Sequence, residues 1–182
     1  MSLSISQSAL CLQHGGVLAY PTEAVWGLGC DPFNQRAFET ILQLKRRDPA
    51  KGVIVLFANY AQLAPYLSSP IQIEQSPRAT SYLVNIKPGA MPSWIIGQHA
   101  KLAIRICEHP LVQQLIRESG KPLVSTSLNP QGKQPAKHAF QVWRYFRAAL
   151  QQKQLQICQG SVGNERRPSR IIDAESRRIL RH

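Results

Sequence analysis

Residues 52–57 read Gly-Val-Ile-Val-Leu-Phe, a continuous apolar run. A run of this length without polar alternation predicts an inner β-strand covered on both faces, as in sheets that carry helices on either side. Extended by Ala58 it is the longest apolar stretch in the chain, and a membrane helix needs roughly 20 such residues. The run therefore favours an α/β domain with no membrane association.

The segment before this strand predicts an amphipathic helix that ends in cations. Asn34 is a helix-capping residue, and the apolar positions after it have helical spacing: Ala37, Phe38, Ile41, Leu42 and Leu44. The helix is expected to end in Lys45-Arg46-Arg47-Asp48-Pro49, because cations are favoured at the C-terminal end of a helix. Three positive charges are thereby delivered to one end of the helix.

Strands and helices alternate along the rest of the chain. Further strands are expected over residues 17–20, 24–30, 80–86, 102–106, 123–124, 155–158 and 170–172, and helices over residues 5–14, 59–67, 110–120 and 137–150. The last helix is expected to bury Phe140, Trp143 and Phe146. No repeat or linker divides the pattern, so we expect one domain over residues 1–182: a twisted, mostly mixed or antiparallel open sheet flanked by helices.

The composition points to an anionic partner. The 182 residues include 22 Lys and Arg against 10 Asp and Glu, a formal net charge of +12, which suits a nucleotide or RNA. The N-terminus lacks the basic leader of a secretory signal. The four cysteines are too dispersed for a zinc site and are expected to be buried thiols in a reducing, cytoplasmic environment: Cys11, Cys30, Cys107 and Cys158.

Cationic and polar side chains gather where the predicted elements end. Lys45, Arg47 and Lys51 could neutralise a phosphate chain, although a solvated helix terminus carries the same residue types. The polar run Ser125–Asn129 follows a predicted strand, where ordinary turn chemistry is an equal explanation. Each of these segments is a weak signal alone.

Arg105 is a charge inside an apolar strand, so it needs a partner, either a carboxylate of the protein or an anionic substrate. Thr22 and Glu23 follow a strand that Pro21 ends, and they either contact a ligand or cap the turn. Six arginines among residues 166–182 form either a solvated tail or an RNA contact.

Several common catalytic motifs are missing from the sequence. It contains no G-x-x-x-x-G-K-[ST] phosphate loop, no G-x-G-x-x-G and no G-x-S-x-G elbow, and its five histidines lack metal-ligand spacing. We therefore expect chemistry by positioning and charge stabilisation, without a covalent nucleophile.

Five motifs occur in order along nearly the whole chain. They are Tyr20–Asp31 (YPTEAVWGLGCD), Leu44–Arg47 with Lys51-Gly52, Ala103–Ile106 with His109-Pro110, Pro122–Asn129 (PLVSTSLN) and Pro168–Ile171 (PSRI). Together they resemble the YrdC/TsaC family of threonylcarbamoyl-AMP synthases, in its short, single-domain bacterial form. Agreement of five ordered motifs by chance is improbable.

The resemblance implies a twisted α/β fold with a basic concave cavity. It also implies an ATP-dependent nucleotidyltransferase that converts L-threonine, bicarbonate or CO2, and ATP into L-threonylcarbamoyladenylate and pyrophosphate. Mg²⁺ would be held mainly by phosphate oxygens and water. Partner proteins of the same pathway would place the threonylcarbamoyl group on adenosine 37 of tRNAs that read codons beginning with A, and contact with tRNA or other structured RNA is implied as well.

Carried over by position, the resemblance also implies the site residues. Those expected to contact ATP are Lys45, Arg47, Lys51, Ser127 and Asn129. Those expected to bind threonine are Thr22, Arg105, Ser125 and Ser169. No residue is expected to act as a covalent nucleophile or a metal ligand. Arg47 is expected at an exposed helix end.

The sequence departs from the family pattern at residues 75–80, at Leu128 and at Arg170, where bulkier groups are expected to line the pocket. One alternative is therefore a non-catalytic tRNA- or rRNA-binding protein in ribosome maturation. Another is a carbamoyl-transfer module like those of hydrogenase-maturation proteins, which the single-domain length and the lack of zinc-finger cysteines disfavour.

Overall fold

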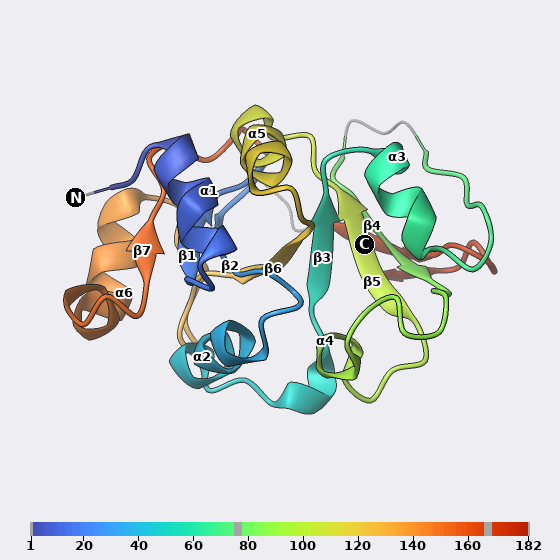
Figure 1. The fold of residues 1–182 in the computed structure, drawn as a ribbon, viewed down its shortest axis with the longest axis horizontal. Coiled ribbons are helices and arrows are strands. Elements are labelled where there is room, and N and C mark those ends of the chain that lie inside the picture. The colour runs from blue at the N-terminus through green and yellow to red at the C-terminus, as the bar shows by residue number, and fades with distance from the viewer. Residues whose placement is uncertain (1, 75–77, 166–168, 182) are drawn as a thin grey trace.

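A computed structural model describes residues 2–74, 78–165 and 169–181 (Figure 1). Its strands are β1 (Leu18–Pro21), β2 (Trp26–Gly29), β3 (Ile54–Phe57), β4 (Thr80–Val84), β5 (Leu102–Ile106), β6 (Leu123–Ser127), β7 (Gln156–Ile157), β8 (Arg170–Asp173) and β9 (Ile179–Arg181). Its α-helices are α1 (Ile5–Gln13), α2 (Gln35–Lys45), α3 (Tyr60–Leu63), α4 (Ser93–Ile96), α5 (Pro110–Ser119) and α6 (Ala139–Gln151). Short 3₁₀ turns, η1 (Pro49–Lys51) and η2 (Ala64–Tyr66), follow α2 and α3.

The described strands form a nine-stranded sheet in the order β7-β1-β2-β6-β3-β5-β4-β8-β9. Five neighbouring pairs are antiparallel, and the pairs β1–β7, β3–β5 and β4–β8 are parallel. The sheet is open, because β7 and β9 lie at opposite edges of that order. The expected mixed, open sheet flanked by helices is confirmed.

Strand β3 is covered on both faces, as its unbroken apolar sequence predicts. Val55 and Phe57 pack into one hydrophobic cluster, and Leu56 packs into a second cluster. Side chains alternate between the two faces of a strand, so the clusters lie on opposite faces of the sheet. Helices α1 and α5 cover one face, whereas α2 and α4 lie on the other (Figure 1).

Helix α6 buries a different face from the predicted one. Its buried residues include Val142 and Phe146, whereas Phe140 and Trp143 are 63% and 44% exposed. The spacing of four residues between Val142 and Phe146 sets the inward phase of the helix, and Phe140 falls on the opposite side. The prediction was wrong for Phe140 and Trp143 because it counted aromatic residues without fixing that phase.

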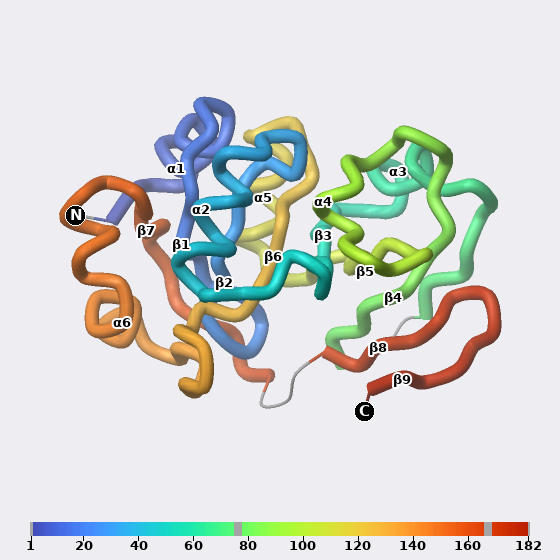
Figure 2. The backbone as a smooth tube through the Cα atoms, turned by 90° about the horizontal axis from the view of Figure 1, so that it is seen from below, coloured from blue at the N-terminus to red at the C-terminus, as the bar shows by residue number. Residues whose placement is uncertain are grey.

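The C-terminal arginines that the structure describes belong to folded structure and not to a solvated tail. Arg170 pairs with Glu74 at 2.9 Å, and the guanidinium of Arg181 donates to the carbonyl of Ser169 at 2.7 Å. Strands β8 and β9 extend the sheet beyond β4 (Figure 2). The arginines at 166 and 167, the proline of the Pro168–Ile171 motif and residues 75–77 of the divergent segment lie outside the described residues.

The cysteines are free thiols, and three of them are buried as expected: Cys30, Cys107 and Cys158. Cys11 is half-buried. Among the described residues, no helix combines the length and apolar character required to cross a membrane.

Candidate functional site

A cavity of about 890 Å³ is lined by residues from strands on both sides of β3 in the sheet. Seven of the nine predicted site residues line it: Thr22, Arg47, Lys51, Arg105, Ser125, Ser127 and Ser169. The other two, Lys45 and Asn129, lie directly behind Ser127 and contact each other. Segments far apart in the sequence therefore converge on one site.

The way in which helix α2 ends explains why Arg47 lines the cavity and Lys45 does not. Lys45 is the last helical residue and is only 7% exposed, because it lies on the inward face of the helix. Arg46 adopts the left-handed conformation at φ 49°, which ends the helix and turns the chain. This turn places Arg47 at the cavity while Lys45 remains beneath it.

Lys45 holds the turn that follows β6. Its ammonium donates to the carbonyl of Ser127, to the carbonyl of Asn129 at 3.1 Å and to Oδ1 of Asn129 at 3.0 Å. The hydroxyl of Ser127 donates to the same Oδ1 at 2.7 Å. Burial, helped by the nearby charge of Arg47, lowers the pKa of Lys45 to about 8.

Arg47 is half-buried, so the prediction of an exposed helix end is wrong. Its Nη2 donates to the carbonyl of Gly52 at 2.7 Å, and its buried Nε has no hydrogen-bond partner. Gly52 has φ 53°, and a Cβ there would lie 2.4 Å from the carbonyl oxygen of Ile96. Burial lowers the pKa of Arg47, which Asp48 partly offsets.

Thr22 forms the tip of the hairpin between β1 and β2. Its backbone N–H and its hydroxyl both donate to the carbonyl of Val25, at 3.0 and 2.8 Å. The hydroxyl is thus used to close the turn, as the turn-capping interpretation expects. Thr22 also lines the cavity, where its contact with a ligand stays a prediction.

Arg105 has a carboxylate of the protein as its partner, and its contact with an anionic substrate stays a prediction. Its Nη2 lies 3.1 Å from Oε2 of Glu23, and its side chain is 11% exposed and lines the cavity. Burial would raise the pKa of Glu23, but Arg105, the thiol of Cys107 and the backbone N–H of Glu108 together lower it. Glu23 therefore remains ionised and balances the charge of Arg105.

Arg181 is a cavity residue that the sequence interpretation missed. Strand β9 carries it to Ser169, where its Nη2 donates to the hydroxyl at 3.0 Å and to the carbonyl at 2.7 Å. The Ser169 hydroxyl also lies 3.0 Å from the hydroxyl of Ser81. Burial and the charges of Arg105 and Arg78 lower the pKa of Arg181. The arginine-rich C-terminus was the available signal, but its pattern does not single out one residue.

The cavity lining is rich in cationic side chains. Arg47, Lys51, Lys101, Arg105, Lys137 and Arg181 line it, and none of the described lining residues is Asp or Glu. Of these cations, Lys101 is engaged with Asp173 and Glu175 at 2.8 and 2.9 Å. No cluster of His, Cys, Asp or Glu suited to hold a metal ion occurs among the described residues.

Leu128 and Arg170, two of the divergent positions that the structure describes, do not line the cavity. Leu128 is fully buried in the core and exchanges backbone hydrogen bonds with Trp26 and Ala136. Arg170 pairs with Glu74, and Thr80 donates to the carbonyl of Arg78. The expectation that Leu128 and Arg170 crowd the pocket is therefore wrong, since the core and the ion pair take up their bulk.

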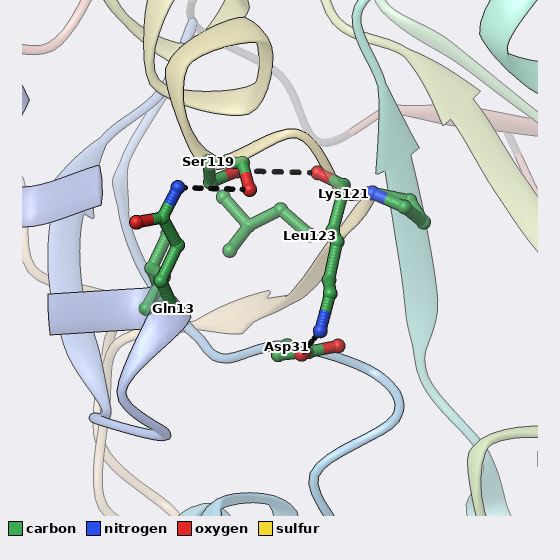
Figure 3. A pocket seen from close by; sticks show the side chains of 7 residues that line it. Gln13, Asp31, Ser119, Lys121 and Leu123 are labelled. Atoms are coloured by element: carbon green, nitrogen blue, oxygen red, sulfur yellow. Dashed lines mark hydrogen bonds and ion pairs between the residues drawn. The ribbon is translucent and has the colours of Figure 1, made fainter. Parts of the chain in front are cut away.

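A second pocket, beside α5 and β6, is far too small for a substrate (Figure 3). It encloses about 10 Å³, roughly the space of one water molecule. Lys121 and Asp31 form an ion pair at 2.5 Å across it, and Gln13 donates to the carbonyl of Ser119 at 3.4 Å. The large cavity is thus the candidate functional site.

Comparison with known sequences gives consistent matches along the chain. Residues 11–182 match the Sua5/YciO/YrdC family model, which is described as "Telomere recombination". A threonylcarbamoyl-AMP synthase of Marinobacter nauticus is 43% identical over 94% of this chain and 93% of its own. One of Acinetobacter baumannii is 42% identical over 100% of this chain and 99% of its own.

Solved structures share the fold. A variant of P. abyssi Sua5 superposes with a TM-score of 0.83 at 23% identity, over 96% of this chain and 57% of that chain. P. abyssi Sua5 complexed with L-threonine gives a TM-score of 0.78 at 24% identity, over 93% of this chain and 50% of that chain. E. coli YciO gives 0.78 at 18% identity, over 100% of this chain and 96% of its own.

Proposed function

Because the chain belongs to the Sua5/YciO/YrdC family, we propose that it is a threonylcarbamoyl-AMP synthase. It converts L-threonine, bicarbonate or CO2, and ATP into L-threonylcarbamoyladenylate and pyrophosphate, and is thus an ATP-dependent nucleotidyltransferase. The names of its curated relatives support this activity. The observation that carries the proposal is the convergence of seven predicted site residues on one cavity.

The cavity divides into two halves by the chemistry of its residues. The threonine half consists of Thr22, Arg105, Ser125, Ser169 and Arg181. The nucleotide half consists of Arg47, Lys51 and Ser127, with Lys45 and Asn129 holding the turn behind Ser127. Arg105 pairs with the substrate carboxylate, and the cations of the nucleotide half contact the phosphates.

The reaction joins two anions, so the cavity must suppress their repulsion. The deprotonated amine of threonine and CO2 form a carbamate and release a proton to solvent, and the carbamate oxygen then attacks the α-phosphorus of ATP while pyrophosphate leaves. Arg47 and Lys51 offset the phosphate charge, which lets the carbamate approach. Arg105 and Ser125 fix the position of the amino acid. No covalent intermediate with the protein is required.

Mg²⁺ enters as part of the nucleotide. None of the described lining residues is a carboxylate, the ligand type that Mg²⁺ takes from proteins. The residues present therefore suit a magnesium–nucleotide complex whose metal is coordinated by phosphate oxygens and water, while the protein contributes cations to the remaining phosphate charge.

RNA is the second partner that we propose, at the outer face of α6. Phe140, Trp143 and Arg144 recur at helical spacing and share one face of the helix, Arg147 follows the kink at Phe146, and all four are exposed. Residues 121–164 contain no Asp or Glu and six Lys or Arg. Exposed aromatic rings stack on unpaired bases and arginines contact phosphates, which suits a structured RNA such as tRNA.

This RNA contact is tested with unmodified tRNA by fluorescence anisotropy. Replacing Phe140 and Trp143 by Ser is expected to weaken binding about tenfold or more, because two stacking platforms are lost. Leu10→Ser, which removes another exposed apolar side chain on α1, is the matched control. Equal tRNA affinities of the wild type, the variant changed at Phe140 and Trp143, and Leu10→Ser would contradict RNA binding at this face of α6.

The synthase itself is tested by pyrophosphate release. Release is expected only when ATP, L-threonine and bicarbonate are present together, with threonylcarbamoyladenylate identified by mass spectrometry. A non-catalytic RNA-binding protein would bind tRNA in a salt-dependent way with no threonine-dependent release, and the comparisons do not favour that alternative. Downstream transfer to tRNA, by partner proteins in the cytoplasm, completes the proposed role.

A further inference from the structure

Glu23 lies behind Arg105 and outside the cavity lining. Its side chain is 14% exposed, and its two carboxylate oxygens have different partners. Oε2 lies 3.1 Å from Nη2 of Arg105, whereas Oε1 accepts from the thiol of Cys107 at 3.0 Å and from the N–H of Glu108 at 3.1 Å. Oε1 therefore anchors the carboxylate, and Oε2, which is buried and accepts no hydrogen bond, faces the guanidinium as an ion pair.

The backbone at Glu23 is held from a second side. The carbonyl of Thr22 accepts from the N–H of Gly163 at 2.9 Å, and the carbonyl of Glu23 accepts from the N–H of Glu165 at 3.0 Å. A Cβ at Gly163 would lie 2.9 Å from the Glu23 carbonyl oxygen, so the glycine permits this close approach. The backbone of the hairpin tip is thus held by residues 163–165, while the carboxylate contacts the chain just after β5.

Glu23 offsets the charge of one of the two arginines that meet here, Arg105 and Arg181. Arg105 lies close enough to Arg181 to lower the pKa of that arginine, together with burial and Arg78. Glu23 is the carboxylate that pairs with Arg105 at contact distance. The Nε of Arg105 is buried without a hydrogen-bond partner and is out of reach of a ligand, so the Nη atoms are the donors that Arg105 can offer to the cavity it lines.

We propose that Glu23 is a positioning residue, which holds one edge of the Arg105 guanidinium and leaves a donor free for the carboxylate of the amino-acid substrate. The inference rests on the proposed function, in which Arg105 binds threonine. Because Glu23 offsets the charge of Arg105, Arg181 is left as the uncompensated cation of the threonine half, which therefore suits a single carboxylate better than a chain of phosphates. Glu23 thus contributes to substrate choice without touching the substrate.

Calorimetric binding of L-threonine and of L-threoninol, the amino alcohol that lacks the carboxylate, tests this role. The wild type is expected to prefer threonine, and Glu23→Gln is expected to weaken threonine binding about tenfold while changing threoninol binding little. The ratio of the affinities for threonine and threoninol therefore falls in Glu23→Gln. A purely structural loss would weaken the binding of both ligands and leave this ratio unchanged. Glu118→Gln, an exposed carboxylate on α5, is the control for the change in net charge.

Each outcome decides the inference. An unchanged preference for threonine in Glu23→Gln overturns the positioning role and leaves the proposed synthase intact. No binding of threonine by the wild type, with ATP analogue present or absent, overturns both. If Glu23→Gln melts too low for calorimetry, Glu23→Asp retains the charge but retracts it by one methylene. An intermediate loss of preference in Glu23→Asp supports the role, and full retention opposes it.

Discussion

The two halves of the cavity satisfy their cations differently. In the threonine half, Arg105 faces the carboxylate of Glu23, and Arg181 donates to neutral oxygens of Ser169. In the nucleotide half, Lys45 and Arg47 donate to neutral oxygens: those of Ser127, Asn129 and Gly52. A carbonyl satisfies a donor but leaves the positive charge uncompensated. The threonine half, in which one of two arginines is offset by a carboxylate, therefore suits the carboxylate of a zwitterion, and the unbalanced nucleotide half suits a chain of phosphates.

The largest effect is expected from Arg47→Gln, which removes a charge from the unbalanced half. Threonine-dependent pyrophosphate release should fall about a hundredfold, because a preorganised charge-assisted contact to the phosphates is lost. Arg46→Gln removes the same charge from the exposed neighbouring position and should retain nearly full activity. Equal activities of the two variants would show that the nucleotide half does not depend on a cation at residue 47.

The second prediction concerns Arg105→Gln, which removes a charge from the threonine half of the cavity. The KM for threonine should rise about tenfold or more, since a buried charge-assisted pair with the substrate is lost, while the KM for ATP should change little. Arg117→Gln, on the exposed side of α5, provides the charge-matched control. Parallel increases in both KM values would indicate that the halves are not separate.

Lys45 gives a pH-dependent prediction. Its pKa in the folded protein, about 8, lies below its value in the unfolded chain, so between pH 8 and 10 the unfolded state retains a proton that the folded state has lost. This group therefore adds to stability as the pH rises through that range. The free energy of unfolding of the wild type, minus that of Lys45→Met, should increase from pH 8 to 10.

The difference between the two proteins isolates Lys45 from other groups. Burial raises the thiol pKa values of Cys30, Cys107 and Cys158, which opposes stability in the same pH range, but these cysteines are present in both proteins. Urea unfolding at each pH gives the free energies. A difference that stays flat from pH 8 to 10 would mean that Lys45 is not desolvated behind the Ser127–Asn129 turn.

The smallest effect is expected from Lys51→Gln. Lys51 is exposed at the cavity and screened by solvent, so the KM for ATP should rise only about threefold at low salt, and the increase should fade as salt is added. The measurement is the KM for ATP across a salt series. An increase that persists at high salt would assign Lys51 a direct, desolvated phosphate contact.

The sequence predicted the sheet well because the signals that set it are local. The unbroken apolar run at β3 and the interleaving of strands with helices suffice for a mixed α/β sheet. The phase of α6 could not be obtained in the same way, because tertiary contacts at Val142 and Phe146 choose which face is buried. Counting aromatic residues therefore failed at Phe140.

Candidate site residues could be predicted from the sequence where they belong to a motif. They could not be predicted where they act through a partner that is distant in the sequence. Arg105 stands out as a charge in an apolar strand, but the sequence does not reveal that Glu23 is its partner, 82 positions away. Arg181 was hidden among similar arginines, because only the pairing of β9 with β8 carries it to Ser169. The burial of Leu128 likewise depends on contacts with Trp26 and Ala136.

The most direct measurement is equilibrium dialysis of labelled L-threonine against the intact protein, with and without a saturating non-hydrolysable ATP analogue. Two adjacent halves of one cavity predict a ternary complex, in which one threonine per chain stays bound at saturating analogue. Displacement of threonine by the analogue would contradict the account, because the two ligands would then compete for a single place.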